Sequence, residues 1–260
     1  MYLLRTRIKK DIVCEFLPPT AAHKRKGAAR IASSSRPAKA IILCGGAPSY
    51  PAKRELMQFL SKKGYWVFNP RYRGSWESGG SFLKLSPHRD VLDIIDQLPR
   101  GFKDLWSGKT YKVIRPEIYL IGGSFGGPAV VLASRDPRVR KAVAFSPVTD
   151  WRVETKTEPI ETLTRFTREA FGNGYRGTKK DWGKLKTGTF YNPAHEAAHI
   201  DGGKLFIIHA KDDKVVYAKT SAAFARATGA RLTLLPRGGH LSMSTVMIPE
   251  FWNPIKKFFK

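Results

Sequence analysis

Hydrophobic residues along this chain occur in short uninterrupted runs, separated by segments in which they recur every three or four positions. The uninterrupted runs indicate strands buried on both faces, and the spaced positions indicate helices with one buried face. The predicted strands lie at residues 39–44, 65–68, 114–121, 141–145, 204–209 and 231–235. The predicted helices lie at residues 53–63, 88–98, 128–134, 217–228 and 251–259.

This alternation predicts an α/β fold with a mostly parallel central sheet and helices on both faces. Residues 2–17 add two strands around a turn at residues 9–11, which gives the sheet an antiparallel start. Residues 18–37 are polar and punctuated by proline and serine, so we expect a surface loop there, with a short strand near residues 28–32. A length of 260 residues suits one sizeable core, and we expect a single domain over residues 1–260.

One glycine-rich turn carries the clearest chemical signal. The strand predicted at residues 114–121 runs into Gly122-Gly123-Ser124-Phe125-Gly126, which fits the G-x-S-x-G pattern, and a helix-compatible run follows. A nucleophilic serine needs a sharp strand-to-helix turn, where side chains two positions away would collide, so glycine occupies those positions. Ser124 is therefore the predicted nucleophile, although a plain glycine loop is the simpler alternative.

A serine nucleophile needs a base and an acid that orients the base. In folds of this class the chain order is serine, acid, histidine, and the sequence offers Ser124, then Asp213, then His240, each just after a predicted strand. Asp212 competes with Asp213, and we expect it to be solvated or to cap the following turn. His240 competes with five other histidines: His23 in a basic loop, His88 at a helix start, His195 and His199 at i, i+4 spacing, and strand-ending His209.

When the serine attacks a carbonyl group, the negative charge that develops on the carbonyl oxygen needs two N–H donors. The residue after the nucleophile supplies one, the amide of Phe125. We expect the second from Gly46, since Gly45-Gly46 follows the first buried strand and lets the backbone approach the substrate. A simple tight turn would use the same glycines.

Several motifs resemble those of the α/β-hydrolase superfamily, and within it the catalytic domain of prolyl-oligopeptidase-like enzymes. They are Cys44-Gly45-Gly46-Ala47-Pro48, Tyr72-Arg73-Gly74-Ser75, Gly122-Gly123-Ser124-Phe125-Gly126-Gly127, His209-Ala210-Lys211-Asp212-Asp213-Lys214-Val215-Val216 and Gly239-His240. Their order over residues 39–260 is that of the family, and the H-x-x-x-D spacing from His209 places the acid at Asp213. Cys44 stands where the family has histidine, and Ala47 where it has proline. No β-propeller precedes these motifs.

Residues 151–200 break the alternation of strands and helices, and their seven aromatic residues lie among Lys, Arg, Thr and Gly. The resemblance implies a cap at this place in the chain. We expect a small, partly helical lid over Ser124, whose aromatic rings could line an acyl or aromatic pocket. A surface segment held by ordinary packing, with no role at the site, is an alternative of equal weight.

The charge is strongly unbalanced, with 46 Lys and Arg against 21 Asp and Glu, a net charge of +25. Basic residues are spread along the chain, and only His23-Lys24-Arg25-Lys26 with Arg30 forms a cluster, without interleaved aromatic residues. This favours a broadly basic surface over a nucleic-acid function. Two cysteines, Cys14 and Cys44, make no disulfide framework. The absence of a long apolar run predicts no membrane span and, by default, a cytoplasmic location.

Together these features predict a serine hydrolase that cleaves carboxylic esters through an acyl-enzyme, with a small ester or short peptide as substrate and no metal or organic cofactor. The absent propeller favours esters over peptides. A serine peptidase of the prolyl-oligopeptidase type is the first alternative, and a non-catalytic polyanion-binding protein is the second.

Overall fold

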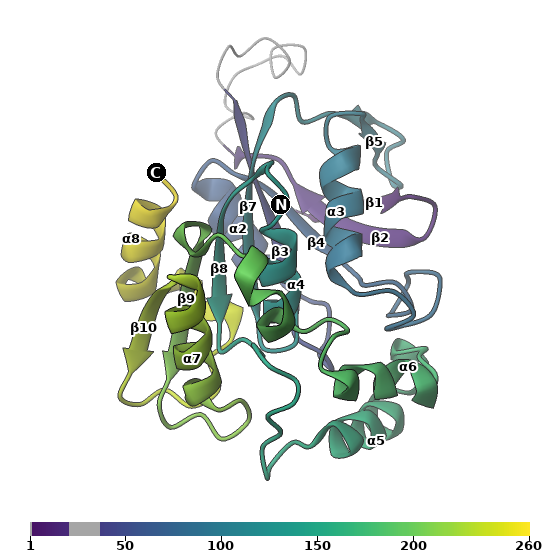
Figure 1. Cartoon of the computed structure of the whole chain (residues 1–260). Helices are drawn as coiled ribbons and strands as arrows, with labels where there is room; N and C mark the ends of the chain where they lie inside the picture. Colours follow the sequence, from purple (N-terminus) through teal and green to yellow (C-terminus); the bar gives the residue numbers. More distant parts are fainter. Residues whose placement is uncertain (1, 21–36) are drawn as a thin grey trace.

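An eight-stranded sheet forms the centre of the protein, with the strand order β1-β2-β4-β3-β7-β8-β9-β10 (Figure 1). The structure is a computed structural model, and it describes residues 2–20 and 37–260. The predicted short strand near residues 28–32 and the basic cluster at residues 23–30 lie outside these described residues. The strands of the sheet are β1 (Leu4–Ile8), β2 (Ile12–Leu17), β3 (Ala38–Cys44), β4 (Trp66–Pro70), β7 (Pro116–Gly123), β8 (Val139–Phe145), β9 (Leu205–Ala210) and β10 (Arg231–Leu235).

Strand direction in the sheet confirms the predicted mostly parallel α/β fold. From β4 to β10 every neighbouring pair of strands is parallel, whereas β2 is antiparallel to both β1 and β4. The central strands β3 and β7 pair over seven residues, with Ile42 opposite Leu120. Every side chain in the last four residues of both strands is buried, as continuous apolar runs require.

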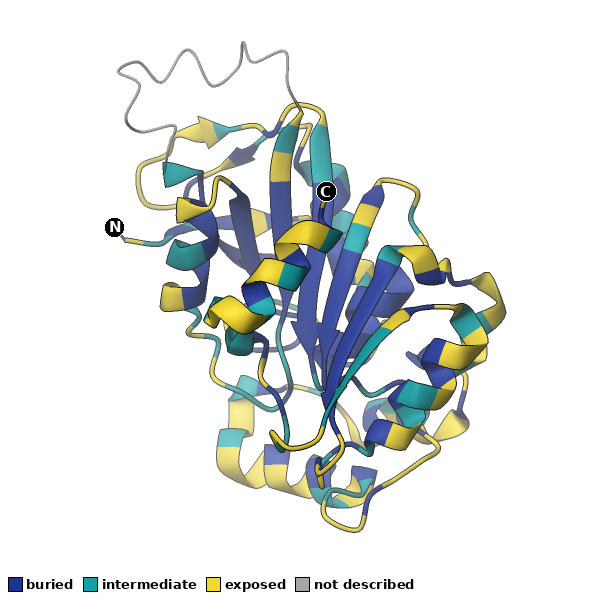
Figure 2. Cartoon of the chain, turned by 90° about the vertical axis from the view of Figure 1, so that its left-hand side faces the viewer, coloured by how far each residue is buried: buried dark blue, intermediate teal, exposed yellow. Residues whose placement is uncertain are grey.

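Helices cover both faces of the sheet (Figures 1 and 2). Buried side chains of α3, α4 and α7 pack in one core, and those of α2 and α8 pack in a second core on the opposite face. Each helix except the fully buried α4 is buried on one side and exposed on the other (Figure 2). Their bounds are α2 (Arg54–Lys62), α3 (His88–Gln97), α4 (Gly126–Ala133), α7 (Ala218–Thr228) and α8 (Pro249–Phe258).

A small antiparallel pair, β5 (Phe102–Lys103) with β6 (Thr110–Tyr111), was not predicted from the sequence. Each of its strands has two residues, too few to show an alternating pattern. The strand before Ser124 also differs from expectation, because it begins at Pro116 and continues to Gly123. The predicted hairpin of residues 2–17 is present as β1 and β2.

The segment between β8 and β9 leaves the sheet and forms α5 (Ile160–Phe171), α6 (Lys179–Gly183) and several 3-10 turns. Figure 1 places α5 and α6 at the edge where the parallel strands end. Backbone hydrogen bonds tie this segment to the loop after β4: Arg176 donates to Gly74 O at 2.7 Å, and Phe82 donates to Arg176 O at 2.9 Å. Trp182 is buried against Phe82. The segment is therefore packed onto the body of the protein.

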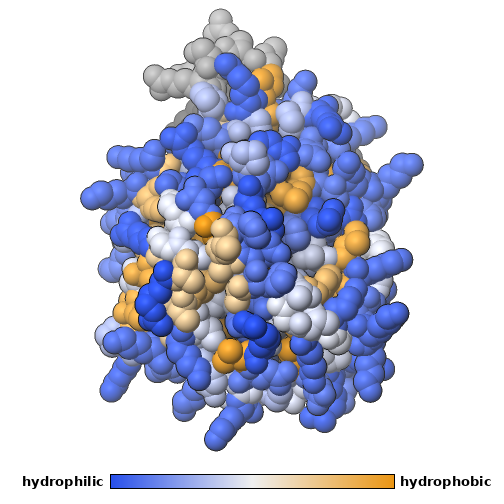
Figure 3. Space-filling view, in the orientation of Figure 1, coloured by the Kyte–Doolittle hydropathy of each residue, from blue (hydrophilic) through white to orange (hydrophobic). Residues whose placement is uncertain are grey.

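One face of the protein is predominantly polar. The face in Figure 3 is largely hydrophilic, and its hydrophobic residues form small separate patches. Among the helices of residues 2–20 and 37–260, none has the length and apolar character needed to span a membrane.

Candidate active site

Ser124 occupies a strained turn between β7 and α4. Its backbone φ is 52°, in the left-handed region that residues other than glycine rarely adopt. The flanking glycines have no room for a side chain: a Cβ on Gly126 would lie 2.0 Å from the Cys44 carbonyl oxygen, and one on Gly122 would lie 2.5 Å from a methyl group of Val130. The turn therefore has the geometry that the G-x-S-x-G pattern predicts, and Ser124 lines an open pocket.

Asp213 and His240 meet at the same edge of the sheet, Asp213 after β9 and His240 after β10. Asp213 Oδ2 lies 2.8 Å from His240 Nδ1. The Asp213 side chain is fully buried, whereas 25% of the His240 side chain is exposed. An ionised carboxylate has no proton to donate, so His240 Nδ1 must carry the proton of this hydrogen bond. In the neutral imidazole, Nε2 is then unprotonated and can act as a base.

The link between Ser124 and His240 is not formed in this conformation. Among the described residues, no hydrogen bond joins the Ser124 hydroxyl to His240. Hydrogen bonds of this kind are often long in a free enzyme and shorten when substrate binds. The structure thus brings two of the three predicted residues into contact and places the third at the same sheet edge.

Four groups hold the Asp213 carboxylate. Its Oδ1 accepts the backbone amides of Val215 at 2.8 Å and Val216 at 3.0 Å, and its Oδ2 faces His240 and His209. Burial alone would raise the pKa of Asp213, but these hydrogen bonds outweigh it and hold the pKa well below its usual range. Asp213 is therefore a fixed anion in contact with the His240 imidazole.

His209 is the residue that sequence reasoning left out of the site. Its Nε2 lies 3.0 Å from Asp213 Oδ2 and 3.0 Å from the carbonyl oxygen of Val216, and its Nδ1 lies 2.9 Å from Ser221 Oγ. Because Nε2 faces two acceptors, it carries the proton, and Nδ1 can accept from Ser221. The expected structural role of His209 thus includes direct contact with Asp213. In the sequence, only the four-residue spacing between the two residues pointed to this contact.

The loop that carries His240 is fixed from two sides. Asp212 Oδ1 accepts the amide of Gly239 at 2.9 Å, and Ser146 Oγ accepts the amide of Leu241 at 3.0 Å. Asp212 is exposed, as the sequence had suggested, and it also binds the histidine loop, which the sequence had not indicated. The two neighbouring aspartates contact different atoms of one loop, one at the backbone and one at the imidazole.

The two predicted oxyanion donors lie beside Ser124. Phe125 directly precedes α4, and a Cβ built on Gly46 would lie 3.6 Å from Ser124 Cβ. Within the described residues, neither amide donates a hydrogen bond, so both remain available. The helix N-terminus adds a favourable field for negative charge. Cys44, just before the glycines, is fully buried, and burial raises the pKa of its thiol well above the usual range.

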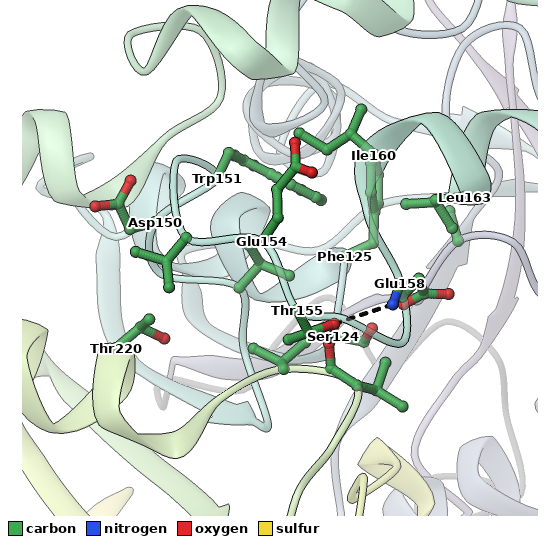
Figure 4. Close-up of a pocket in the computed structure, with 15 residues that line it drawn as sticks. Ser124, Phe125, Asp150, Trp151, Glu154, Thr155, Glu158, Ile160, Leu163 and Thr220 are labelled. Carbon is green, nitrogen blue, oxygen red and sulfur yellow. Dashed lines mark hydrogen bonds between the residues drawn. The ribbon is translucent and has the colours of Figure 1, made fainter.

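We call the hollow beside Ser124 the serine pocket. It is open to solvent, and the space between its walls, open solvent included, is about 500 Å³. Most of its lining comes from the first part of the segment between β8 and β9, as Figure 4 shows. Trp151, Ile160 and Leu163 form apolar walls. Trp151 is the one aromatic residue of residues 151–200 on this wall, so the expected aromatic lining is smaller than predicted.

Acidic side chains also line the serine pocket, and no basic residue does within the described chain. Asp150 is paired with Arg152 at 2.8 Å, and Glu154 is exposed. Glu158 is partly buried, and its backbone amide donates to Thr155 Oγ1 at 3.0 Å (Figure 4). Burial raises the pKa of the Glu158 carboxyl, His240 opposes the rise, and Asp213 adds to it.

The competing histidines lie elsewhere. His195 and His199 are exposed on a 3-10 helix beside Glu196, at 3.8 and 3.6 Å. Among the described residues, no group of three potential ligands could hold a metal ion. His88 lies at the start of α3 with Nδ1 2.7 Å from Ser86 Oγ, and His23 lies outside the described residues.

Solved structures with this fold include several hydrolases. An esterase of Pyrococcus furiosus matches with a TM-score of 0.65 and 17% identity, over 99% of this chain and 89% of the esterase. An acylaminoacyl peptidase of Pyrococcus horikoshii matches with a TM-score of 0.61 and 17% identity, over 99% of this chain and 40% of the peptidase. A monoglyceride lipase of Saccharomyces cerevisiae matches with a TM-score of 0.62 and 13% identity, over 99% of this chain and 94% of the lipase.

These similarities show the α/β-hydrolase fold. No curated protein sequence matches the chain. The profile of the prolyl oligopeptidase family, however, matches residues 51–259, a span that contains Ser124, Asp213 and His240. On that match the chain belongs to the prolyl oligopeptidase family, a group of serine hydrolases built on the α/β-hydrolase fold.

Proposed function

We propose that this serine hydrolase cleaves carboxylic esters, with Ser124 as nucleophile, His240 as base and Asp213 as the acid that orients the base. The observation that carries the proposal is the 2.8 Å contact between Asp213 and His240 Nδ1, at the sheet edge where Ser124 sits in its strained turn. This contact fixes the imidazole tautomer whose Nε2 can accept a proton.

The proposed reaction has two stages. Ser124 Oγ attacks the ester carbonyl while its proton moves to His240 Nε2, and the amides of Phe125 and Gly46 stabilise the oxyanion. The intermediate then expels the alcohol, which takes the proton from His240. Water next attacks the acyl-enzyme and gives a proton to His240, and the acid leaves as that proton returns to Ser124.

The preference for esters has a chemical basis. An amide has a poorer leaving group than an ester, so its hydrolysis depends more strongly on the oxyanion donors. Loss of one such donor costs about 3 kcal/mol in other serine hydrolases. Peptide hydrolysis remains the alternative. We also propose that residues 151–200 form a lid over Ser124.

A substrate panel tests the proposal. We expect hydrolysis of short p-nitrophenyl esters and no more than weak hydrolysis of aminoacyl p-nitroanilides, with purified Ser124→Ala as the blank for both. Faster turnover of the anilides would assign the enzyme to the peptidase alternative. A protein that turns over neither class and binds polyanions with a steep salt dependence would support the non-catalytic alternative.

A further inference from the structure

A second hollow is lined by the same loop that borders the serine pocket: Gly45 and Gly46 line the second hollow, and Ala47 lines the serine pocket. We call it the loop pocket; its lining includes Gly45, Gly46, Lys53, Arg71, Trp76 and Tyr175. Gly46 also lies against Ser124, since a Cβ built on it would be 3.6 Å from Ser124 Cβ. A ligand in the loop pocket would therefore contact the same loop that bounds the nucleophile.

The two pockets carry opposite charges. The acidic residues of the serine pocket are Asp150, Glu154 and Glu158, whereas the loop pocket has two basic residues and, within the described chain, no acidic one. A substrate group that carries a negative charge would be repelled by the first lining and attracted by the second. The two pockets would therefore favour substrate groups of different charge.

Most of the charge on Arg71 is already neutralised. Its side chain is 3% exposed and forms ion pairs with Glu15 at 2.9 Å and Glu77 at 3.5 Å. Arg5 pairs with the same two carboxylates at 3.3 and 3.1 Å, so two cations face two anions. The buried Nε of Arg71 has the ion-pair distance to Glu77 but lacks a hydrogen-bond partner.

Lys53 is the excess cation of the loop pocket. Among the described residues, its ammonium makes neither a hydrogen bond nor an ion pair, and it is partly buried. Burial lowers the pKa of Lys53, and the neighbouring Arg71 charge lowers it further. A bound anion would stabilise the charged ammonium against both effects. Because the pocket has one uncompensated cation, a ligand group with a single negative charge matches it better than a group with two.

Aromatic side chains form fixed walls of the same pocket. Trp76 Nε1 donates to the carbonyl oxygen of Ser49 at 3.2 Å, and the Tyr175 hydroxyl bonds to the same residue through its amide at 3.0 Å and its carbonyl oxygen at 3.1 Å. The two rings pack edge to face, with centroids 6.2 Å apart. Tyr50 packs on Trp76 and is 68% exposed at the pocket mouth. These walls suit an apolar or planar group next to the anion.

We propose that the loop pocket is a subsite for a carboxylate-bearing part of the substrate, held by the Lys53 ammonium between the walls of Trp76 and Tyr175. The serine pocket then receives the uncharged or cationic part. The link of this subsite to catalysis rests on the proposed function, whereas binding of a carboxylate in the loop pocket does not.

Calorimetric titration with phenylacetate and its uncharged analogue phenylacetamide tests the subsite without turnover. We expect wild type and Ser124→Ala to bind phenylacetate about tenfold more tightly than phenylacetamide, the scale of one charge-assisted hydrogen bond. Lys53→Met and Lys53→Gln should lose this preference, and Lys53→Arg should keep it. The control Lys62→Met changes an exposed lysine at the other end of α2 and should behave as wild type. Equal binding of the two compounds by wild type, or an unchanged preference in both neutral Lys53 variants, would overturn the subsite.

Inhibition of p-nitrophenyl butyrate hydrolysis tests the link to catalysis. We expect phenylacetate to compete with the ester, with an inhibition constant about tenfold higher in Lys53→Met, the same loss of one charge-assisted bond. Non-competitive inhibition would separate the loop pocket from the substrate site and overturn this link. Absence of ester hydrolysis would count against the proposed function alone, because the calorimetric preference would still decide the subsite.

Discussion

The residues of the proposed triad and most residues of the serine pocket come from two regions that are stabilised in different ways. Ser124, Asp213 and His240 each follow a strand of the central sheet, whereas most of the serine pocket is lined by the segment between β8 and β9. The strand ends are fixed by sheet hydrogen bonds, so they can place reacting groups precisely. The segment between β8 and β9 is bound by loop contacts and aromatic packing, and its Tyr191 donates to the carbonyl oxygen of Phe125 at 2.7 Å. In the described chain, its pocket-lining side chains take no part in the sheet hydrogen bonds that fix the strand ends. Substitutions in the two regions should therefore differ in kind: triad changes should lower kcat for every substrate, and segment changes should alter the order of substrates.

The largest of the graded effects should come from Asp213. Asp213→Asn replaces the anion with a neutral amide, which favours the wrong tautomer of His240, and we expect a loss on the order of 10⁴-fold in kcat, as in the general Ser-His-Asp case. The matched control Asp212→Asn should lose less than about tenfold, since an amide oxygen can still accept the Gly239 N–H. A large loss in the control with a small one in Asp213→Asn would reverse the assignment of the acid.

His209 should have a smaller effect, through the position of Asp213. His209→Phe removes one hydrogen bond from the carboxylate, and we expect kcat to fall by about tenfold, the scale of one hydrogen bond to a charged group. His209→Gln can still donate to Asp213 Oδ2 and should retain most of the activity. Thermal unfolding of both variants separates this role from stability alone. Equal activity losses in both, in step with equal losses of stability, would reduce His209 to a packing residue.

Pocket-wall changes should alter selectivity by several-fold. Leu163 lines the serine pocket on α5, and Leu163→Ala would enlarge it by three carbon atoms, each worth about 0.8 kcal/mol of apolar contact. We expect the preferred acyl chain of p-nitrophenyl esters to lengthen. Phe166→Ala, at an exposed position of the same helix, serves as the control. If both variants kept the wild-type chain-length profile, α5 would be a packing element and not a wall of the acyl site.

The smallest expected effect is on stability against acid. Folding lowers the pKa of Asp213 from its ordinary value of 3.8, so the folded state favours the carboxylate. The resulting stabilisation is fully present above that ordinary pKa and is lost as the pH falls toward the folded value. The free energy of unfolding should therefore be higher in wild type than in Asp213→Asn near pH 7, and this difference should be smaller at about pH 3. A difference that grows on acidification would contradict the sign of this pKa shift.

The sequence predicted the regions that obey simple periodic rules. Continuous apolar runs located the central strands, and steric need at Gly122 and Gly126 made the Ser124 turn recognisable. Contacts between distant segments left no such pattern. Nothing local indicates that Tyr175 reaches Ser49, or that Glu158 lines the same pocket as Ser124, because tertiary packing decides both. For the same reason the lining of the serine pocket, and the charge difference between the pockets, came only from the structure.

Covalent labelling with a fluorophosphonate tests the central claim most directly. The probe reacts with an activated serine, and peptide mass spectrometry then locates the adduct. We expect a single adduct on Ser124 in wild type and none in folded Ser124→Ala, together with loss of ester turnover on the order of 10⁶-fold, as measured for nucleophile removal in subtilisin. An adduct on another serine, or ester turnover that survives in Ser124→Ala, would contradict the assignment of Ser124 as the nucleophile.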